Sequence, residues 1–104
     1  MISIHSIEEN EFIVNYVKEQ PSSLTRVWIG LKRRVYGSNE FVWIDKSPVD
    51  YVNWNLGEPN NDGGTLERYV EMWIYRNGKW NDLIEDNLAF VCGFNCKLSI
   101  KFLK

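Results

Sequence analysis

The 104-residue sequence has few of the side chains that form disulfide networks or zinc sites. It contains two cysteines, Cys92 and Cys96, and one histidine, His5. Two cysteines cannot build a framework of several disulfides, and a structural zinc site needs about four Cys or His ligands close together. We therefore exclude a disulfide-rich scaffold and a structural zinc centre, and we expect His5 to be structural or solvated.

Positive charge is not in excess, and long apolar runs are missing. Lys and Arg number 12 against 14 Asp and Glu, so the net charge is -2. The chain therefore has no excess of basic residues to bind the phosphates of a nucleic acid. Every apolar stretch is far shorter than the roughly 20 residues that span a bilayer, and residues 1–5 show no targeting pattern. We expect neither nucleic-acid binding nor membrane insertion.

What the sequence does have is the composition of one globular domain. Hydrophobic residues make up 44% and charged residues 25%, which argues against intrinsic disorder, and the length suits a single domain. Aromatic residues are frequent, at 14%, and their rings supply large buried areas. We interpret most of them as core residues rather than as a binding platform.

The sequence predicts one helix among several short strands. Ser6 and Glu9 form a capping box ahead of apolar residues at helical spacing, so we expect a helix from residue 7 to residue 19. Asn77-Gly78 supplies a tight turn for a hairpin. The expected strands lie at residues 2–4, 26–31, 41–44, 69–75 and 88–92.

Three segments lie between or after these elements. We interpret the basic run 32–34 as a solvated loop without a function. Residues 45–82 are rich in Asn, Asp, Gly and Pro and form a long loop that ends in the hairpin; such loops in compact domains usually carry function. The tail 95–104 alternates apolar and polar residues, so it is either an added edge strand or an unstructured end.

Side-chain oxygens gather in the second part of the long loop without a compensating cluster of Lys or Arg. Calcium takes about six to eight oxygen ligands from carboxylates, amides and backbone carbonyls, whereas zinc prefers His and Cys. We therefore predict a site for a hard cation such as calcium. The candidate donors are Glu58, Asn60, Asn61, Asp62, Glu67, Glu71, Asn81 and Asp82.

The order of three short motifs resembles the C-type lectin-like domain. Trp-Ile-Gly-Leu at 28–31 is followed by Glu-Pro-Asn at 58–60 and by Trp-Asn-Asp at 80–82. The resemblance spans about residues 2–94. It implies an α+β fold in which one helix packs on short antiparallel strands beside a long calcium-binding loop region.

The resemblance also implies a calcium-dependent sugar site, in which neighbouring sugar hydroxyls complete the coordination of one ion. In this family Glu-Pro-Asn accompanies mannose, fucose and N-acetylglucosamine, whereas Gln-Pro-Asp accompanies galactose, because exchanging acid and amide reverses donors and acceptors. Pro59 is implied to be cis, and Glu71 is an alternative ligand to Glu67. The implied calcium ligands are Glu58, Asn60, Glu67, Asn81 and Asp82, and the implied sugar contacts are Glu58, Asn60, Glu67 and Asn81.

The chain departs from the family pattern at its start and at its cysteines. A first strand is missing, as is a first helix that carries the partner of Cys92, so we expect a truncated domain. Cys92 is then either free or paired with Cys96, and we favour a free, buried thiol. The positions of the family's short disulfide hold Tyr69 and Glu85, so that bridge cannot form.

The resemblance sets three further expectations. Asn61, Arg68 and the basic pair 32–33 stand where an auxiliary calcium site would need acids, so we expect one calcium ion at most. Extracellular location is implied because the family's sites depend on external calcium. We divide the chain into a truncated C-type lectin-like domain at 1–94 and a tail or added edge strand at 95–104.

Two other functions stay open. A lectin-like module that binds protein and has lost calcium would fit the missing disulfides. A glycosidase with Glu58 and Glu67 as its paired acids is disfavoured, because these acids lie in a polar loop and no nucleophile with a base is visible. We therefore expect a binder and not an enzyme. Exposed apolar side chains at Ile2, Ile4 and Phe12 also predict self-association.

Overall fold

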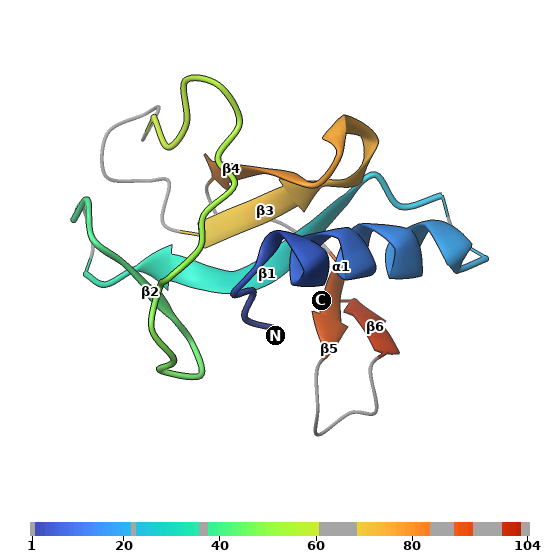
Figure 1. Ribbon diagram of the computed structural model, residues 1–104, viewed down its shortest axis with the longest axis horizontal. Helices are drawn as coiled ribbons and strands as arrows, with labels where there is room; N and C mark the ends of the chain where they lie inside the picture. Colours follow the sequence, from blue (N-terminus) through green and yellow to red (C-terminus); the bar gives the residue numbers. More distant parts are fainter. Residues whose placement is uncertain are drawn as a thin grey trace.

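The computed structural model describes residues 2–21, 23–35, 38–60, 69–83, 89–92 and 99–102, the last two segments in their backbone only. The helix α1 (Ile7–Glu19) lies across a sheet to which all the described strands belong, and a long loop rises beside β4 (Figure 1). The fold is α+β, as the sequence predicts.

The helix begins and ends at the predicted residues. The Ser6 hydroxyl accepts the backbone N–H of Glu9 at 3.1 Å, and the Glu9 carboxylate accepts the N–H of His5 at 2.7 Å. These bonds satisfy donors at the start of the helix and its entry segment. The buried side chains recur every three or four positions and face the sheet: Asn10, Ile13, Val14 and Val17.

The sheet is built around β1 (Arg26–Arg33), which pairs with three other strands. It runs antiparallel to β2 (Phe41–Trp43) and β3 (Tyr69–Trp73), and parallel to β5 (Ala89–Cys92). The strand β4 (Lys79–Leu83) pairs with β3 at one edge, and β6 (Ser99–Phe102) pairs with β5 at the other. The tail therefore contains a strand.

The predicted hairpin is present, with a longer connection than the sequence suggests. β3 ends at Trp73, and the 3-10 helix η2 (Ile74–Arg76) replaces the expected last strand residues. Asn77 and Gly78 then adopt left-handed backbone conformations, with φ of 56° and 74°. Glycine accepts this conformation without strain and asparagine tolerates it better than most residues, so this dipeptide turns the chain into β4.

Three predictions about the first part of the chain are wrong. Residues 2–4 form no strand; the carbonyl of Ile2 accepts one bond from the N–H of Gly30 at 2.9 Å. Ile4 is fully buried in the core instead of being exposed, whereas Phe12 is 54% exposed as expected. The basic run is not a solvated loop, because β1 continues to Arg33, which is buried.

The core is centred on Trp80, and its contacts position the long loop. Trp43, Tyr51 and Trp54 each meet the Trp80 ring nearly edge-on, at 5.8 to 5.9 Å between centroids. The backbone of Trp80 also donates to the carbonyl of Asn53 and accepts from the N–H of Asn55, both at 2.9 Å. Loop residues 53–55 are therefore fastened to β4, and this attachment lies three residues before the Glu-Pro-Asn motif at 58–60.

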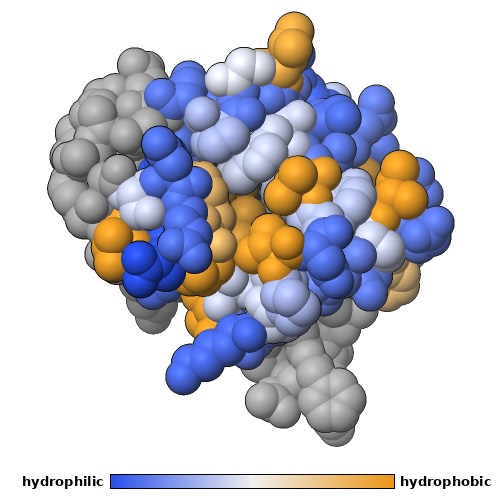
Figure 2. All heavy atoms as spheres, turned by 60° about the vertical axis from the view of Figure 1, so that its left-hand side comes forward, coloured by the Kyte–Doolittle hydropathy of each residue, from blue (hydrophilic) through white to orange (hydrophobic). Residues whose placement is uncertain are grey.

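Several predicted features lie outside the described residues. They are Asn61, Asp62, Glu67, Arg68, Glu85 and Cys96, together with the side chain of Cys92. In the described part of the chain, the helices fall short of the length and apolar character that a membrane span requires. Apolar side chains on the face shown in Figure 2 form small patches among hydrophilic ones.

Candidate functional site

The Glu-Pro-Asn motif forms a compact turn. The N–H of Glu58 donates to the carbonyl of Asn55 at 2.9 Å, and the Glu58–Pro59 bond is cis, as the resemblance implies. The N–H of Asn60 then donates to the carboxylate of Glu58 at 3.1 Å. The acid and the amide of the motif are thus held side by side.

Asp82 reaches this turn from β4. Its Oδ1 accepts the same Asn60 N–H at 3.1 Å, so the carboxylates of Glu58 and Asp82 converge on one donor. Alternate residues of β4 face the interior, and Asp82 is fully buried, like Trp80. The structure therefore brings together Glu58, Asn60 and Asp82.

Arg33 is the residue at this site that sequence reasoning missed. Its side chain is only 1% exposed, and its Nη2 donates to Oδ2 of Asp82 at 2.6 Å. Its Nη1 donates to the carbonyl of Ser38 at 2.6 Å, and the guanidinium lies 4.7 Å from the ring centroid of Phe41. Strand alternation past Gly30 is the signal that could have found it, because Leu31 and Arg33 share the buried face.

Asn81 does not join the other predicted ligands. Its amide donates to Oε2 of Glu71 at 2.8 Å, directly across the β3–β4 ladder. Trp73 donates to the same oxygen at 2.7 Å, and Arg26 lies 3.4 Å from the other one. Adjacent strand residues point to opposite faces, so Asn81 and the alternative ligand Glu71 lie across the sheet from Asp82.

The described donors suit a hard cation in part. Two carboxylates converge on one N–H, and Asn60 adds an amide oxygen, which is the kind of ligand that calcium takes. Against this, the Asp82 carboxylate already forms an ion pair with the positively charged Arg33. Among the described residues, no three His, Cys, Asp or Glu side chains are grouped closely enough to hold a metal. Glu58, Asn60 and Asp82 offer only part of the roughly six to eight oxygen ligands that calcium takes.

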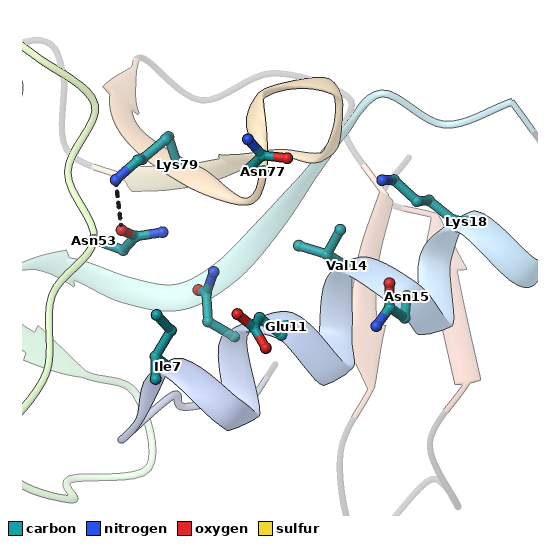
Figure 3. Close-up of a pocket in the computed structure, with 9 residues that line it drawn as sticks. Ile7, Glu11, Val14, Asn15, Lys18, Asn53, Asn77 and Lys79 are labelled. Carbon is teal, nitrogen blue, oxygen red and sulfur yellow. Dashed lines mark hydrogen bonds between the residues drawn. The ribbon is translucent and has the colours of Figure 1, made fainter.

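A groove lies between α1 and the hairpin, away from the Glu-Pro-Asn turn. It has a volume of about 500 Å³, and Figure 3 shows Glu11 and Lys18 on the helix side. On the hairpin side, Lys79 donates to the side-chain oxygen of Asn53 at 3.0 Å. This bond fastens the long loop to β4, so we interpret this groove as structural.

Two curated relatives are similar to most of this chain. The low affinity immunoglobulin epsilon Fc receptor of Mus musculus is 45% identical over 79% of the chain, and a mannose-binding C-type lectin isoform of Oxyuranus scutellatus is 39% identical over 88%. The chain spans 22% and 58% of these proteins, respectively. The matched portion is therefore less than two thirds of each relative.

Solved structures agree with the sequence relatives. The C-type lectin CEL-I from Cucumaria echinata superposes with a TM-score of 0.73 at 33% identity, covering 81% of this chain and 59% of that one. The cow CD23 carbohydrate-recognition domain, solved in the presence of a GlcNAc2Man3 oligosaccharide, gives 0.62 at 41%, covering 79% and 57%. A calcium-independent type II antifreeze protein gives 0.64 at 30%, covering 81% and 58%.

The family model described as the lectin C-type domain matches residues 1–94. This match covers most of the chain, and the relatives and solved structures lead to the same assignment. The chain belongs to the C-type lectin domain family.

Proposed function

We propose that this domain binds mannose-type glycans through one calcium ion held beside the Glu-Pro-Asn turn. The observation that carries the proposal is the convergence of the Glu58 and Asp82 carboxylates on the backbone N–H of Asn60, which gathers oxygen donors at an exposed turn. The printed name of one relative, a mannose-binding lectin, and the oligosaccharide in the cow CD23 title support the ligand class.

Each residue has a proposed role at this site. Glu58, Asn60 and Asp82 would hold the ion, with Glu67 and Asn81 as the further predicted ligands. Bound calcium would supply a positive centre that coordinates two neighbouring sugar hydroxyls. Glu58 and Asn60, joined by Glu67 and Asn81, would accept from and donate to those hydroxyls and fix their orientation.

A calcium-independent protein-binding role is the second candidate, and two observations favour it. Arg33 already occupies Oδ2 of Asp82, and the amide of Asn81 is bonded to Glu71. A structural relative of the same fold is described as calcium-independent. Either role places the domain outside the cell in our proposal, and neither one needs catalysis.

Calorimetry and glycan retention test the leading proposal. Titration of metal-free protein with calcium should show one site with a Kd of about 10⁻⁴ to 10⁻³ M. A mannose-bearing surface should retain the protein with calcium and release it with EDTA. Asn60→Ala should abolish retention, whereas Glu40→Gln, at an exposed acid paired with Arg34, should not. Retention that survives EDTA would favour the protein-binding role.

A further inference from the structure

Arg33 and Asp82 form a buried ion pair that joins two strands. The two side chains are 1% and 0% exposed, and Nη2 and Oδ2 are 2.6 Å apart. The partners are 49 residues apart in the sequence and connect β1 to β4. A buried charge is costly unless it is paired, so each partner restricts the position of the other.

The pair continues into the proposed binding turn. Oδ2 of Asp82 accepts from Arg33, and Oδ1 accepts from the N–H of Asn60. Arg33 is itself fixed by the carbonyl of Ser38 and by the face of the Phe41 ring. A rigid guanidinium, held on both sides, therefore sets the orientation of the carboxylate that anchors Asn60.

We propose that Arg33 is an internal cation that organises the Glu-Pro-Asn turn through Asp82 in the absence of metal. Arg33 is a positioning residue, because it donates to Asp82, which in turn accepts the N–H of Asn60. The turn is then a preformed surface, and calcium adds to an arrangement that exists without it. The proposal rests on the proposed function only in taking this turn as the binding surface.

Hydrogen exchange of metal-free protein in EDTA tests this role without calcium or sugar. The amide of Asn60 should be protected in the wild type. Arg33→Gln should lower that protection by about tenfold or more, the equivalent of at least roughly 1.4 kcal/mol in opening free energy, while amides of the β3–β4 ladder stay protected. The matched control is Arg34→Gln, which removes the neighbouring exposed arginine and its bond to Glu40, and should leave Asn60 unchanged.

A second variant covers the case in which Arg33→Gln does not fold. The double change Arg33→Met with Asp82→Leu replaces the buried pair by apolar side chains, a type of exchange that proteins often tolerate. It removes one of the two acceptors of the Asn60 N–H, the Asp82 carboxylate, and leaves that of Glu58, so the protection of Asn60 should again fall. Unchanged protection in either folded variant, or an unprotected Asn60 in the metal-free wild type, would overturn the proposal. Glycan retention in calcium decides separately on the proposed function.

Discussion

The indole nitrogen of Trp80 donates to the side-chain oxygen of Asn10 at 2.9 Å, across 70 residues of sequence. The same amide group donates from its nitrogen to the carbonyl of Gly78 at 3.2 Å. Asn10 is 1% exposed, so one buried amide from α1 satisfies two polar groups of the hairpin. Because Trp80 also carries the contacts of the long loop, this bond connects the helix to the binding region.

Replacing Asn10 should therefore destabilise the whole domain. Asn10→Ala leaves the buried Trp80 N–H and Gly78 carbonyl without this partner, and we expect a loss of about 2 to 3 kcal/mol in the free energy of unfolding. Urea denaturation followed by tryptophan fluorescence measures it. Asn15→Ala, at an exposed position of the same helix, should change stability by less than about 0.5 kcal/mol. Equal losses in both variants would mean that the bridge is unimportant.

Gly78 should be intolerant of a side chain for two separate reasons. Its φ is 74°, and a Cβ atom there would lie 2.6 Å from both Nδ2 of Asn10 and Cγ2 of Val14. Gly57 provides the matched control, because its φ of 86° imposes the same strain with no atom within 4 Å of a Cβ. We expect Gly57→Ala to cost about 1 kcal/mol and Gly78→Ala at least about 1 to 3 kcal/mol more.

Denaturation curves of the two glycine variants give the difference directly. The strain from positive φ is common to both, so the excess loss in Gly78→Ala reports the close approach of α1 to the turn. If both alanine variants lose the same stability, the helix yields to the methyl group and the contact is softer than the distances indicate.

The local features of the fold were predictable from the sequence, whereas the long-range ones were not. The capping box fixes the start of α1 through residues three apart, and Asn77-Gly78 fixes the hairpin turn through its own backbone preference. Arg33 appeared solvated because its partner Asp82 lies on a strand far along the chain. Its burial depends on which strands pair, and a run of three basic residues does not reveal that.

The candidate site shows the same division. The motif residues Glu58 and Asn60 are together because they are neighbours in one turn. Asn81 and Asp82 are also neighbours, but they lie on a strand, where alternation separates their side chains. The resemblance to the family predicts both residues as ligands of one ion. The extended backbone of β4 decides where their side chains point, and the resemblance does not include it.

Acid should weaken a polar cluster that joins the N-terminal segment to the loop after β2. Burial raises the pKa of Asp45, but hydrogen bonds from Ser3 and Ser47 and the charge of His5 outweigh it, so the pKa falls below the ordinary value of 3.8. A lowered pKa means that the folded state favours the carboxylate. The resulting stability is present above pH 3.8 and is lost as the pH falls through the folded pKa.

Carbon NMR titration of the Asp45 carboxyl group between pH 2 and pH 6, a range of about two units on either side of the ordinary value, tests this expectation. Ser47→Ala removes a hydroxyl donor and should raise the midpoint toward 3.8. Ser23→Ala, an exposed serine outside the cluster, should leave the midpoint where it is. A wild-type midpoint at or above 3.8 would contradict the assigned hydrogen bonds.

Exchanging the acid and the amide of the binding turn should change its sugar preference. Glu58→Gln with Asn60→Asp keeps one carboxylate and one amide beside the ion, so calcium binding should persist. The donors and acceptors offered to two neighbouring hydroxyls are reversed, because the amide nitrogen donates and a carboxylate only accepts. We expect wild type to prefer mannose, fucose or N-acetylglucosamine surfaces and the double variant to shift toward galactose.

Multivalent glycan surfaces are needed for this comparison, because a single sugar should bind at about millimolar Kd, near -4 kcal/mol, and avidity makes such binding measurable. Calcium titration of the double variant is the control that the ion site survives. If that titration is unchanged and the ranking of sugars is unchanged as well, residues 58 and 60 do not orient the sugar. The recognition would then have to come from other residues around the ion, with Glu67 and Asn81 as the first to be exchanged.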